Sequence, residues 1–502
     1  MRFTSLIVEL IRARPRLVLW IVIVCQALIW LAVPMLLYRG PPGDLATVLA
    51  YGREYQVGTD LGPPLAFWLA DIAFRLAGNH VFGVYVLAQL CAIATFRAVY
   101  HLGRNIVGGP QAVIAVLLTM TVTAFSSPGV EFGPLVLARP LWAMVLLHGW
   151  LAIGLGRRNA WFALSIESGL LLLTTTTAMW LLILPLAFGL ATARGRRNLM
   201  SFDPLYAILV VGVLTLPWIL WVVRAGVAVI PQPPVLDDLA GSAQHWAVLL
   251  AWLVAATTGV IVLTAMNWGR LMPKSDDAPI IFRPPVDSTA RAYVYFFALA
   301  PALLGTLSAA LYGRNHVVGG AGIALVMTGL AVVVASGDLI ALRGQRALRK
   351  VWAFAVIAPA LAVLVGVVIL PWLDGPEDPT ALPARDIGRF FSDSFERRTG
   401  RPLPAVSGDP QLAALIGIAP ARPHLLDAAA PARTPWLTPE QFAARGGVVV
   451  WRAADTIGTP PPEIAARFPG LVPEVPRAFD RWINGRRPPL RIGWAILRPT
   501  GP

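Results

Sequence analysis

Two aspartates stand between the first two long apolar segments of the chain, in a position suited to chemistry at a membrane surface. Asp44 follows Gly40-Pro41-Pro42-Gly43, and Asp60 opens the stretch Asp60-Leu61-Gly62-Pro63-Pro64-Leu65. The flanking apolar segments, 17–37 and 81–102, are each long enough to cross a bilayer. A carboxylate at the edge of a membrane can act as a general base toward a substrate hydroxyl.

Asp44 and Asp60 each have a structural and a functional interpretation. Asp44 precedes a predicted interfacial helix over 45–55, where an Asp beside glycine is a common N-cap. As a catalytic group it would instead take a proton from an acceptor hydroxyl while a phosphate leaves. Asp60 fits a turn before a helix that begins at Pro64. Its functional alternative is to orient a substrate or a weakly held divalent ion, completed by phosphate oxygens.

Three further polar residues are candidates for substrate binding. Glu131, in the predicted second outer loop, is either a solvated loop charge or a third carboxylate near the same cavity. Arg314 is an arginine in a loop predicted to be outside, where basic residues are not expected. It either extends to lipid headgroups or binds phosphate in bidentate fashion. His316 is its weaker companion.

Composition places the chain in a membrane. Of its 502 residues, 57% are hydrophobic and 14% are charged, whereas soluble domains average about 25% charged residues. The net charge of +14 does not indicate nucleic-acid binding, because the basic residues fall in short loops between apolar segments. The two cysteines, Cys25 and Cys91, lie inside apolar segments and are interpreted as packing residues rather than a disulfide.

The hydrophobic pattern predicts a polytopic α-helical membrane protein with about eleven spans. Basic side chains such as Arg157 and Arg196 alternate between loops with acidic ones such as Asp44 and Asp238. The positive-inside bias then predicts a cytoplasmic N-terminus and a C-terminus outside. The predicted spans are 17–37, 81–102, 111–126, 133–154, 160–174, 177–193, 205–224, 245–266, 290–311, 318–341 and 351–372.

The last part of the chain has a different composition. Residues 1–372 are predicted to form the transmembrane domain, with a first periplasmic loop at 38–80, and 373–502 a small α+β periplasmic domain. Helical patterns cover 384–399 and 411–418, strand-like patterns cover 448–451 and 490–496, and the prolines at 460–462 indicate irregular chain.

The chain resembles bacterial members of glycosyltransferase family 39, the protein mannosyltransferase and aminoarabinose transferase-like proteins of the GT-C fold. Asp44 occupies the place of the first acid of the family's Asp-Glu pair, and Leu45 stands where the family has Glu. The remaining similarity is carried by Asp60-Leu61-Gly62-Pro63-Pro64-Leu65, Gly78-Asn79-His80-Val81-Phe82-Gly83, Tyr100-His101-Leu102-Gly103-Arg104, Pro217-Trp218, Gly408-Asp409, Pro435-Trp436 and Val449-Val450-Trp451.

The resemblance implies inverting transfer of a sugar from a polyprenyl-phosphate donor to a lipid, glycan or protein hydroxyl, at the outer face of a bacterial inner membrane. Asp44 would be the base, Asp60 would help to place the acceptor or an ion, and Arg314 would neutralise the leaving phosphate. A divalent cation is left open as a cofactor, and no nucleic acid is expected as a partner.

Two other classes of function remain open. A transporter or lipid flippase should carry ionisable residues near the middle of the bilayer, and Glu167, within the predicted span 160–174, is the one serious candidate. A non-catalytic envelope assembly protein would use its C-terminal domain to bind a partner.

Overall fold

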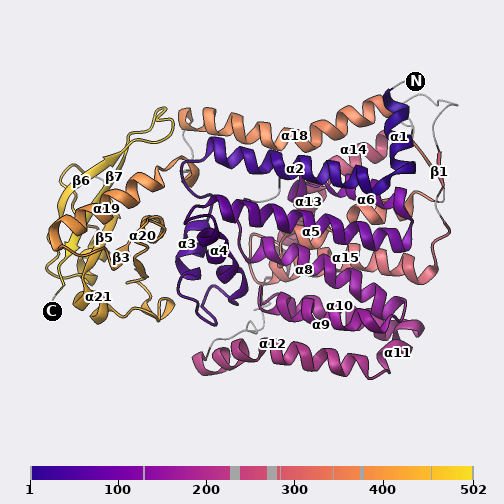
Figure 1. Cartoon of the computed structure of the whole chain (residues 1–502), viewed down its shortest axis with the longest axis horizontal. Helices are drawn as coiled ribbons and strands as arrows, with labels where there is room; N and C mark the ends of the chain where they lie inside the picture. Colours follow the sequence, from indigo (N-terminus) through magenta and orange to yellow (C-terminus); the bar gives the residue numbers. More distant parts are fainter. Residues whose placement is uncertain are drawn as a thin grey trace. The chain divides into compact units, whose positions relative to one another are not determined.

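The computed structural model describes residues 3–127, 130–226, 238–267, 280–282, 284–337, 339–342, 344–373, 378–453 and 455–499. The chain divides into two compact units (Figure 1). Unit 1 comprises Met1–Leu31, Ala88–Gly129 and Pro134–Leu361. Unit 2 comprises Ala32–Leu87, Val130–Gly133 and Ala362–Pro502.

Unit 1 is helical, and three long helices contribute residues to both units. These are α2 (Pro15–Leu37), α5 (Phe82–Ile106) and α18 (Gln345–Ile369). Helix α9 packs against α8 and α12, α6 packs against α17, and α13 packs against α15. The other helices of the unit are α1 (Phe3–Ala13), α6 (Gly109–Thr119), α7 (Thr123–Ser126), α8 (Pro134–Gly149), the π-helix η1 (Trp150–Gly154), α9 (Arg158–Leu172), α10 (Ala178–Ala191), α11 (Ala193–Leu199), α12 (Asp203–Ala225), α13 (Leu239–Ala256), α14 (Thr258–Asn267), α15 (Ser288–Leu311), α16 (Ala321–Leu325) and α17 (Thr328–Ala335).

The protein is a multi-pass membrane protein, but the predicted count of eleven spans is not confirmed. Within the described ranges, seven helices are long and apolar enough to cross a bilayer, and the pair α10–α11 is bent by 110°. The long helices are Pro15–Leu37, Phe82–Ile106, Pro134–Gly154, Asp203–Ala225, Leu239–Ala256, Ser288–Leu311 and Gln345–Trp372.

Two predicted spans are each divided into shorter elements. The segment 245–266 divides at Thr257, where the hydroxyls of Thr257 and Thr258 donate to the carbonyls of Val254 and Ala255. Such side-chain bonds compete with the helical backbone ladder. The segment 318–341 divides into α16 and α17, and it ends in strand β2 (Leu339–Ala341), which pairs antiparallel with β1 (Ile280–Phe282).

Unit 2 joins two short helices of the first loop to a sheet domain. The loop helices are α3 (Leu45–Gly52) and α4 (Leu65–Leu76), which pack against each other. The sheet has the order β4-β3-β5-β7-β6; β3 pairs parallel with β4 and β5, and the other pairs are antiparallel. Its elements are η2 (Leu370–Trp372), η3 (Pro379–Ala381), α19 (Ala384–Thr399), β3 (Ala405–Gly408), α20 (Pro410–Gly417), β4 (His424–Leu426), η4 (Pro431–Arg433), α21 (Pro439–Arg445), β5 (Gly447–Arg452), α22 (Pro462–Arg467), β6 (Glu474–Phe479) and β7 (Leu490–Leu497).

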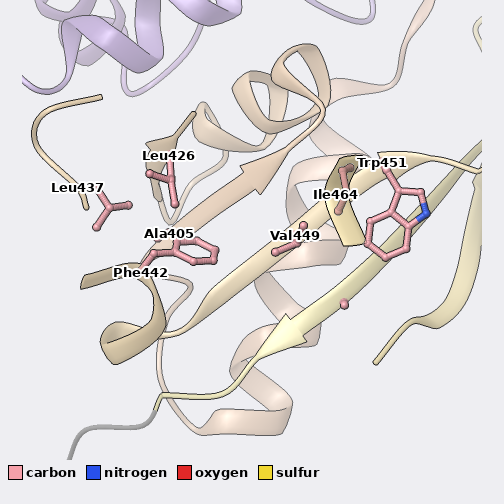
Figure 2. Close-up of a cluster of buried hydrophobic side chains, with 8 residues drawn as sticks. Ala405, Leu426, Leu437, Phe442, Val449, Trp451 and Ile464 are labelled. Carbon is pink, nitrogen blue, oxygen red and sulfur yellow. The ribbon is translucent and has the colours of Figure 1, made fainter. Parts of the chain in front are cut away.

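Strand β5 has apolar side chains on both faces, as a strand covered on both sides requires. Val449 and Trp451 lie in one cluster with Phe442 of α21 and Ile464 of α22 (Figure 2). Val450 points to the other face, where its neighbour Trp494 on β7 contacts Phe391 of α19. Covering both faces fixes the sheet, and α20 extends that contact to α3 of the first loop.

The small α+β domain predicted from the sequence is confirmed. Helix α19 spans the predicted 384–399, and β5 and β7 cover the two predicted strands. The prolines at 460–462 were predicted to be irregular, but Pro462 begins α22, because proline is tolerated in the first turn of a helix. The domain boundary at 372/373 stays a prediction.

Candidate active site

Asp44 stands at the start of α3 without capping it. The backbone carbonyl of Asp44 accepts from the amide of Val48, but its side chain makes no capping hydrogen bond. The carboxylate is exposed and forms no hydrogen bond or ion pair with the residues that the structure describes. The capping interpretation therefore does not account for the side chain, which is left available to a substrate.

Glu131 lies against the residue that precedes Asp44. A Cβ atom on Gly43 would lie 2.6 Å from Cδ and 2.7 Å from Oε2 of Glu131. Gly43 also has a φ of 51°, in the left-handed region that favours glycine. Glycine at this position thus lets two carboxylates from separate loops, Asp44 and Glu131, approach one another.

The two carboxylates interact electrostatically. Burial raises the pKa of Glu131, and the charges of Asp44 and Asp378 raise it further. Asp378 is itself held in place, because its Oδ1 accepts the amide of Thr380 at 2.9 Å. Pairs of carboxylates whose surroundings hold one proton more tightly than the other are typical of acid–base sites.

Tyr38 connects these acids to a cavity of about 840 Å³. Burial, together with Asp378 and Glu131, raises the pKa of Tyr38 to about 12. The phenol therefore stays protonated at neutral pH and can donate a hydrogen bond. Tyr38 lines the cavity along with Arg39, Arg385, Arg389 and one acid, Asp386.

The cavity offers donors suited to an anion. The amide of Phe82 donates to Nδ1 of His80 at 3.0 Å, and burial and Arg385 lower the pKa of His80. A neutral His80 therefore carries its proton on Nε2. The guanidinium of Arg39 stacks 3.7 Å above the ring of Trp482. Arg385 and Arg389 form no ion pair with described residues, which leaves both free for phosphate oxygens.

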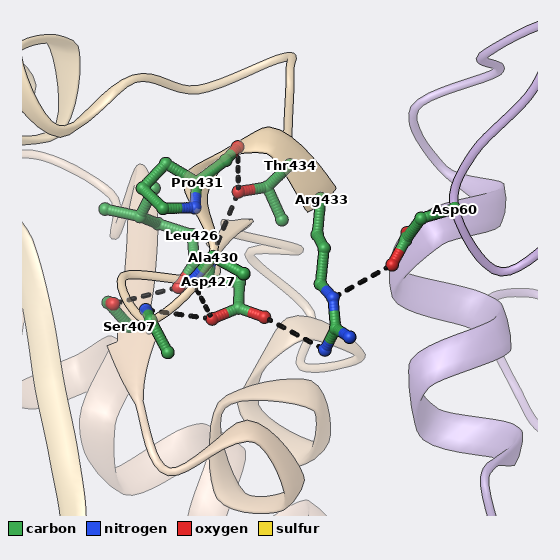
Figure 3. Close-up of polar contacts among 9 residues, drawn as sticks. Asp60, Ser407, Leu426, Asp427, Ala430, Pro431, Arg433 and Thr434 are labelled. Carbon is green, nitrogen blue, oxygen red and sulfur yellow. Dashed lines mark hydrogen bonds and ion pairs between the residues drawn. The ribbon is translucent and has the colours of Figure 1, made fainter. Parts of the chain in front are cut away.

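Asp60 belongs to a different group of charges. It lies in a turn closed by paired hydrogen bonds between Thr59 and Gly62, and its carboxylate is 3.0 Å from Nε of Arg433. Arg433 also approaches Asp427 at 3.8 Å (Figure 3). Burial raises the pKa of Asp60, and Arg433 opposes that shift. The structure thus brings Asp44 and Glu131 together, whereas Asp60 faces the sheet domain.

Two more acids of the first loop pair with the same part of the sheet domain. Asp71, which is fully buried, contacts Arg422, and its other oxygen lies 2.7 Å from Nε of Arg75. Glu54 lies 2.8 Å from Nδ1 of His424. These pairs, with Asp60 and Arg433, hold α3 and α4 to the residues around β4.

Arg314 and His316 are exposed in unit 1, in the loop after α15. The amide of Arg314 donates to the carbonyl of Ala309, and its side chain has no partner among the described residues. Their predicted role in phosphate binding stays a prediction. Arg39, Arg385 and Arg389 are missing from the sequence-based candidates, although the spacing of 385 and 389 on an amphipathic helix signals a shared face.

Binding of a metal ion depends on which ligand side chains lie close together. Among the described residues, no group of three or more His, Cys, Asp or Glu side chains is placed to hold an ion. Asp44 and Glu131 offer two carboxylates, so a divalent cation would need phosphate oxygens to complete its ligands. The protein by itself therefore provides no complete metal site in the part of the chain described.

The arrangement of helices and sheet matches that of solved membrane proteins. The crystal structure of ArnT from Cupriavidus metallidurans bound to undecaprenyl phosphate aligns with a TM-score of 0.60 and 14% identity, covering 96% of this chain and 99% of that one. Its apo form aligns equally well. The chain has the GT-C fold. This confirms, at the level of the fold, the resemblance inferred from the sequence.

The other comparisons cover less of the chain or align less well. Residues 62–221 match the family model described as dolichyl-phosphate-mannose-protein mannosyltransferase, a segment that contains Glu131 and begins after Asp44 and Asp60. The archaeal oligosaccharyltransferase AglB from Archaeoglobus fulgidus, solved with an inhibitory peptide and a dolichol-phosphate, aligns with a TM-score of 0.43 and 14% identity over 81% of this chain and 64% of that one. No curated protein sequence matches the chain.

Proposed function

We propose that this GT-C protein is an inverting glycosyltransferase that moves a sugar from a polyprenyl-phosphate donor to a hydroxyl of a lipid, glycan or protein. The observation that carries the proposal is the uncapped Asp44 carboxylate beside Glu131, next to a cavity lined by arginines. The fold shared with ArnT, which was solved with undecaprenyl phosphate, supports this class of donor.

The reaction follows from the charges at the site. The oxygen of the acceptor hydroxyl attacks C1 of the sugar, and Asp44 accepts the proton that this hydroxyl loses. The bond from C1 to the phosphate oxygen breaks from the opposite face, and its electron pair leaves with polyprenyl phosphate. Glu131 and Tyr38 orient the acceptor by hydrogen bonding. General base catalysis of this kind contributes about 10²–10⁴-fold in rate.

The leaving phosphate gains negative charge, and preorganised cations stabilise it. We assign this role in unit 2 to Arg385 and Arg389, which line the cavity and are free of ion pairs with described residues. Arg314 and His316 stay candidates for phosphate binding on the basis of the sequence alone. Asp60 pairs with Arg433 in the turn that precedes α4, and we retain it as a residue that helps to place the acceptor or an ion.

Loop charge supports a reaction outside the inner membrane. Basic residues between the predicted spans favour a cytoplasmic N-terminus, which puts the first loop and the sheet domain in the periplasm. An acceptor in the cell envelope, such as a lipopolysaccharide component, would meet the site there. The alternative of a transporter has less support, because Glu167 is already engaged by His148 at 2.7 Å.

The test is sugar transfer in nanodiscs with a panel of radiolabelled polyprenyl-phosphate sugars and an envelope extract. Asp44→Asn should lose about 10²–10⁴-fold in transfer rate while keeping its elution profile and its binding of polyprenyl phosphate. Asp409→Asn is the matched control, because Asp409 caps α20 and lies outside the carboxylate pair. Transfer by Asp44→Asn at the control rate would refute the role of Asp44. No transfer by wild type from any donor would refute the proposed activity.

A further inference from the structure

A second cavity, of about 610 Å³, lies in unit 1 and is lined by basic side chains. It is formed by the C-terminal half of α5, by α8 and η1, and by the loop that follows η1. Its basic side chains are Arg97, His101 and Arg104 from α5, His148 from α8, and Arg157. The mechanism proposed above does not use any of these residues.

Three of these groups share one face of a helix. Arg97, His101 and Arg104 are spaced by four and three residues, which places them side by side along α5. Arg16, Arg97 and Arg104 are all close enough to His101 to interact with it electrostatically. Arg97 and Arg104 thus lie two helical turns apart on one face, with His101 between them. Like charges repel, and a negative ligand held by both guanidinium groups would offset that repulsion.

The positive-inside bias alone does not explain why Arg97, His101 and Arg104 lie together on α5. Positive-inside bias requires basic residues in loops, but Arg97 is nine residues before Ile106, the last residue of α5, or about 14 Å along the helix. Arg97, Arg104 and Arg157 are exposed and form no ion pair with any residue in the described ranges. Three guanidinium groups therefore face the cavity uncompensated.

The carboxylate that contacts His148 of the cavity wall already has a partner. Both carboxylate oxygens of Glu167 lie close to Nδ1 of His148, at 2.7 and 2.8 Å. Glu167 is 8% exposed, so its charge is held within the bundle by this contact. The pair fixes the ring of His148 at the cavity wall and leaves the arginines without an acidic partner there.

Apart from Asn105, the rest of the lining is apolar. Met144 and Leu147 of α8 and Leu151 of η1 face the same space as the arginines. An arginine pair recognises a phosphate in bidentate fashion, and an adjoining apolar wall suits the acyl part of a lipid. We propose that this cavity binds the phosphate group of an anionic membrane phospholipid. A free phosphate ion would leave the apolar wall unused.

The test measures lipid binding and is independent of transferase activity. The full chain in detergent is titrated with phosphatidylglycerol and followed by native mass spectrometry, with phosphatidylcholine of the same acyl chains as the neutral comparison. We expect Arg97→Gln and Arg104→Gln each to weaken phosphatidylglycerol binding at least about tenfold, since each removes a charge-assisted hydrogen bond. Phosphatidylcholine binding should not change.

Arg197→Gln is the matched control, because Arg197 is an exposed arginine of α11 outside the cavity. Arg97→Lys keeps the charge and loses the bidentate geometry, so an intermediate affinity is expected. Equal phosphatidylglycerol binding by Arg97→Gln and Arg197→Gln would overturn the proposal. Displacement of the lipid by millimolar inorganic phosphate, with equal affinity for both, would show a free-anion site and overturn the assignment to a lipid.

Discussion

The buried Asp71 makes a sharp prediction about unit 2. Its carboxylate is fully buried and is shared between Arg422 and Arg75, of which Arg75 is half exposed and Arg422 is nearly buried. We predict that Arg422→Gln destabilises the contact between α4 and the segment before β4. The cause is that the substitution leaves a buried charge with one partially solvated partner.

The size of the effect can be worked from this geometry. Two unit charges about 4 Å apart attract by about 4 kcal/mol at an effective dielectric constant of about 20. Breaking a buried ion pair by removing one partner costs about 3–5 kcal/mol. Both figures give the same range, so backbone amides of α4 should exchange about 10²–10⁴-fold faster in Arg422→Gln.

Hydrogen exchange followed by mass spectrometry measures this directly, peptide by peptide, in the detergent-solubilised protein. Arg433→Gln is the control, because its partner Asp60 lies in an exposed pair worth about 0–1 kcal/mol. The double variant Asp71→Leu with Arg422→Met removes both charges and should restore most of the protection. Exchange in α4 that is no faster in Arg422→Gln than in Arg433→Gln would refute the reasoning.

Three further predictions concern the site itself. Gly43→Ala should lower the rate of sugar transfer by about 10²-fold, because the new Cβ atom would displace Glu131 and a displacement of about 1 Å has an effect of that size. A wild-type rate in this variant would contradict the close approach of Gly43 and Glu131. Asp378→Asn removes one of the charges that raise the pKa of Glu131, so the pKa of Glu131 falls. The acid limb of the plot of transfer rate against pH should then move to lower pH. An unmoved limb would show that ionisation of Glu131 does not control the rate. Arg389→Gln should weaken binding of polyprenyl phosphate about tenfold, measured by competition with labelled lipid, whereas Arg445→Gln, an arginine of α21 that does not line this cavity, should not.

Local patterns in the sequence predicted the elements whose stability is local. Helix α19 and strands β5 and β7 appear where amphipathic or alternating residues indicate them, since each buries a face that its own sequence defines. The breaks within 245–266 and 318–341 could not be predicted in the same way. The first break coincides with hydroxyl-to-carbonyl bonds of Thr257 and Thr258. The second segment ends in β2, whose partner β1 is distant in sequence.

The candidate active site could also be predicted only in part from the sequence. Asp44 could be identified because its position relative to a span and a Gly-Pro turn is a local property. The partner of Asp60 could not be identified from the sequence, because Arg433 is distant in sequence and lies beside Asp60 only in the folded protein. Arg39 and Arg389 line one cavity from opposite ends of the chain, and Glu167, read as an isolated acid, is satisfied by His148 from the neighbouring helix α8.

The ion pairs of the first loop also set an order of assembly. Asp71 and Arg422 are separated by 351 residues, and Glu54 and His424 by 370. At about 5–20 residues per second, the ribosome adds the basic partners Arg422 and His424 about 20–70 s after Asp71 and Glu54. During that interval the acidic side chains of the first loop lack the basic partners that they have in the folded unit, so they stay exposed to water. Unit 2 can therefore close only after residues 422–424 have been synthesised, so the first loop cannot reach its final contacts in chain order.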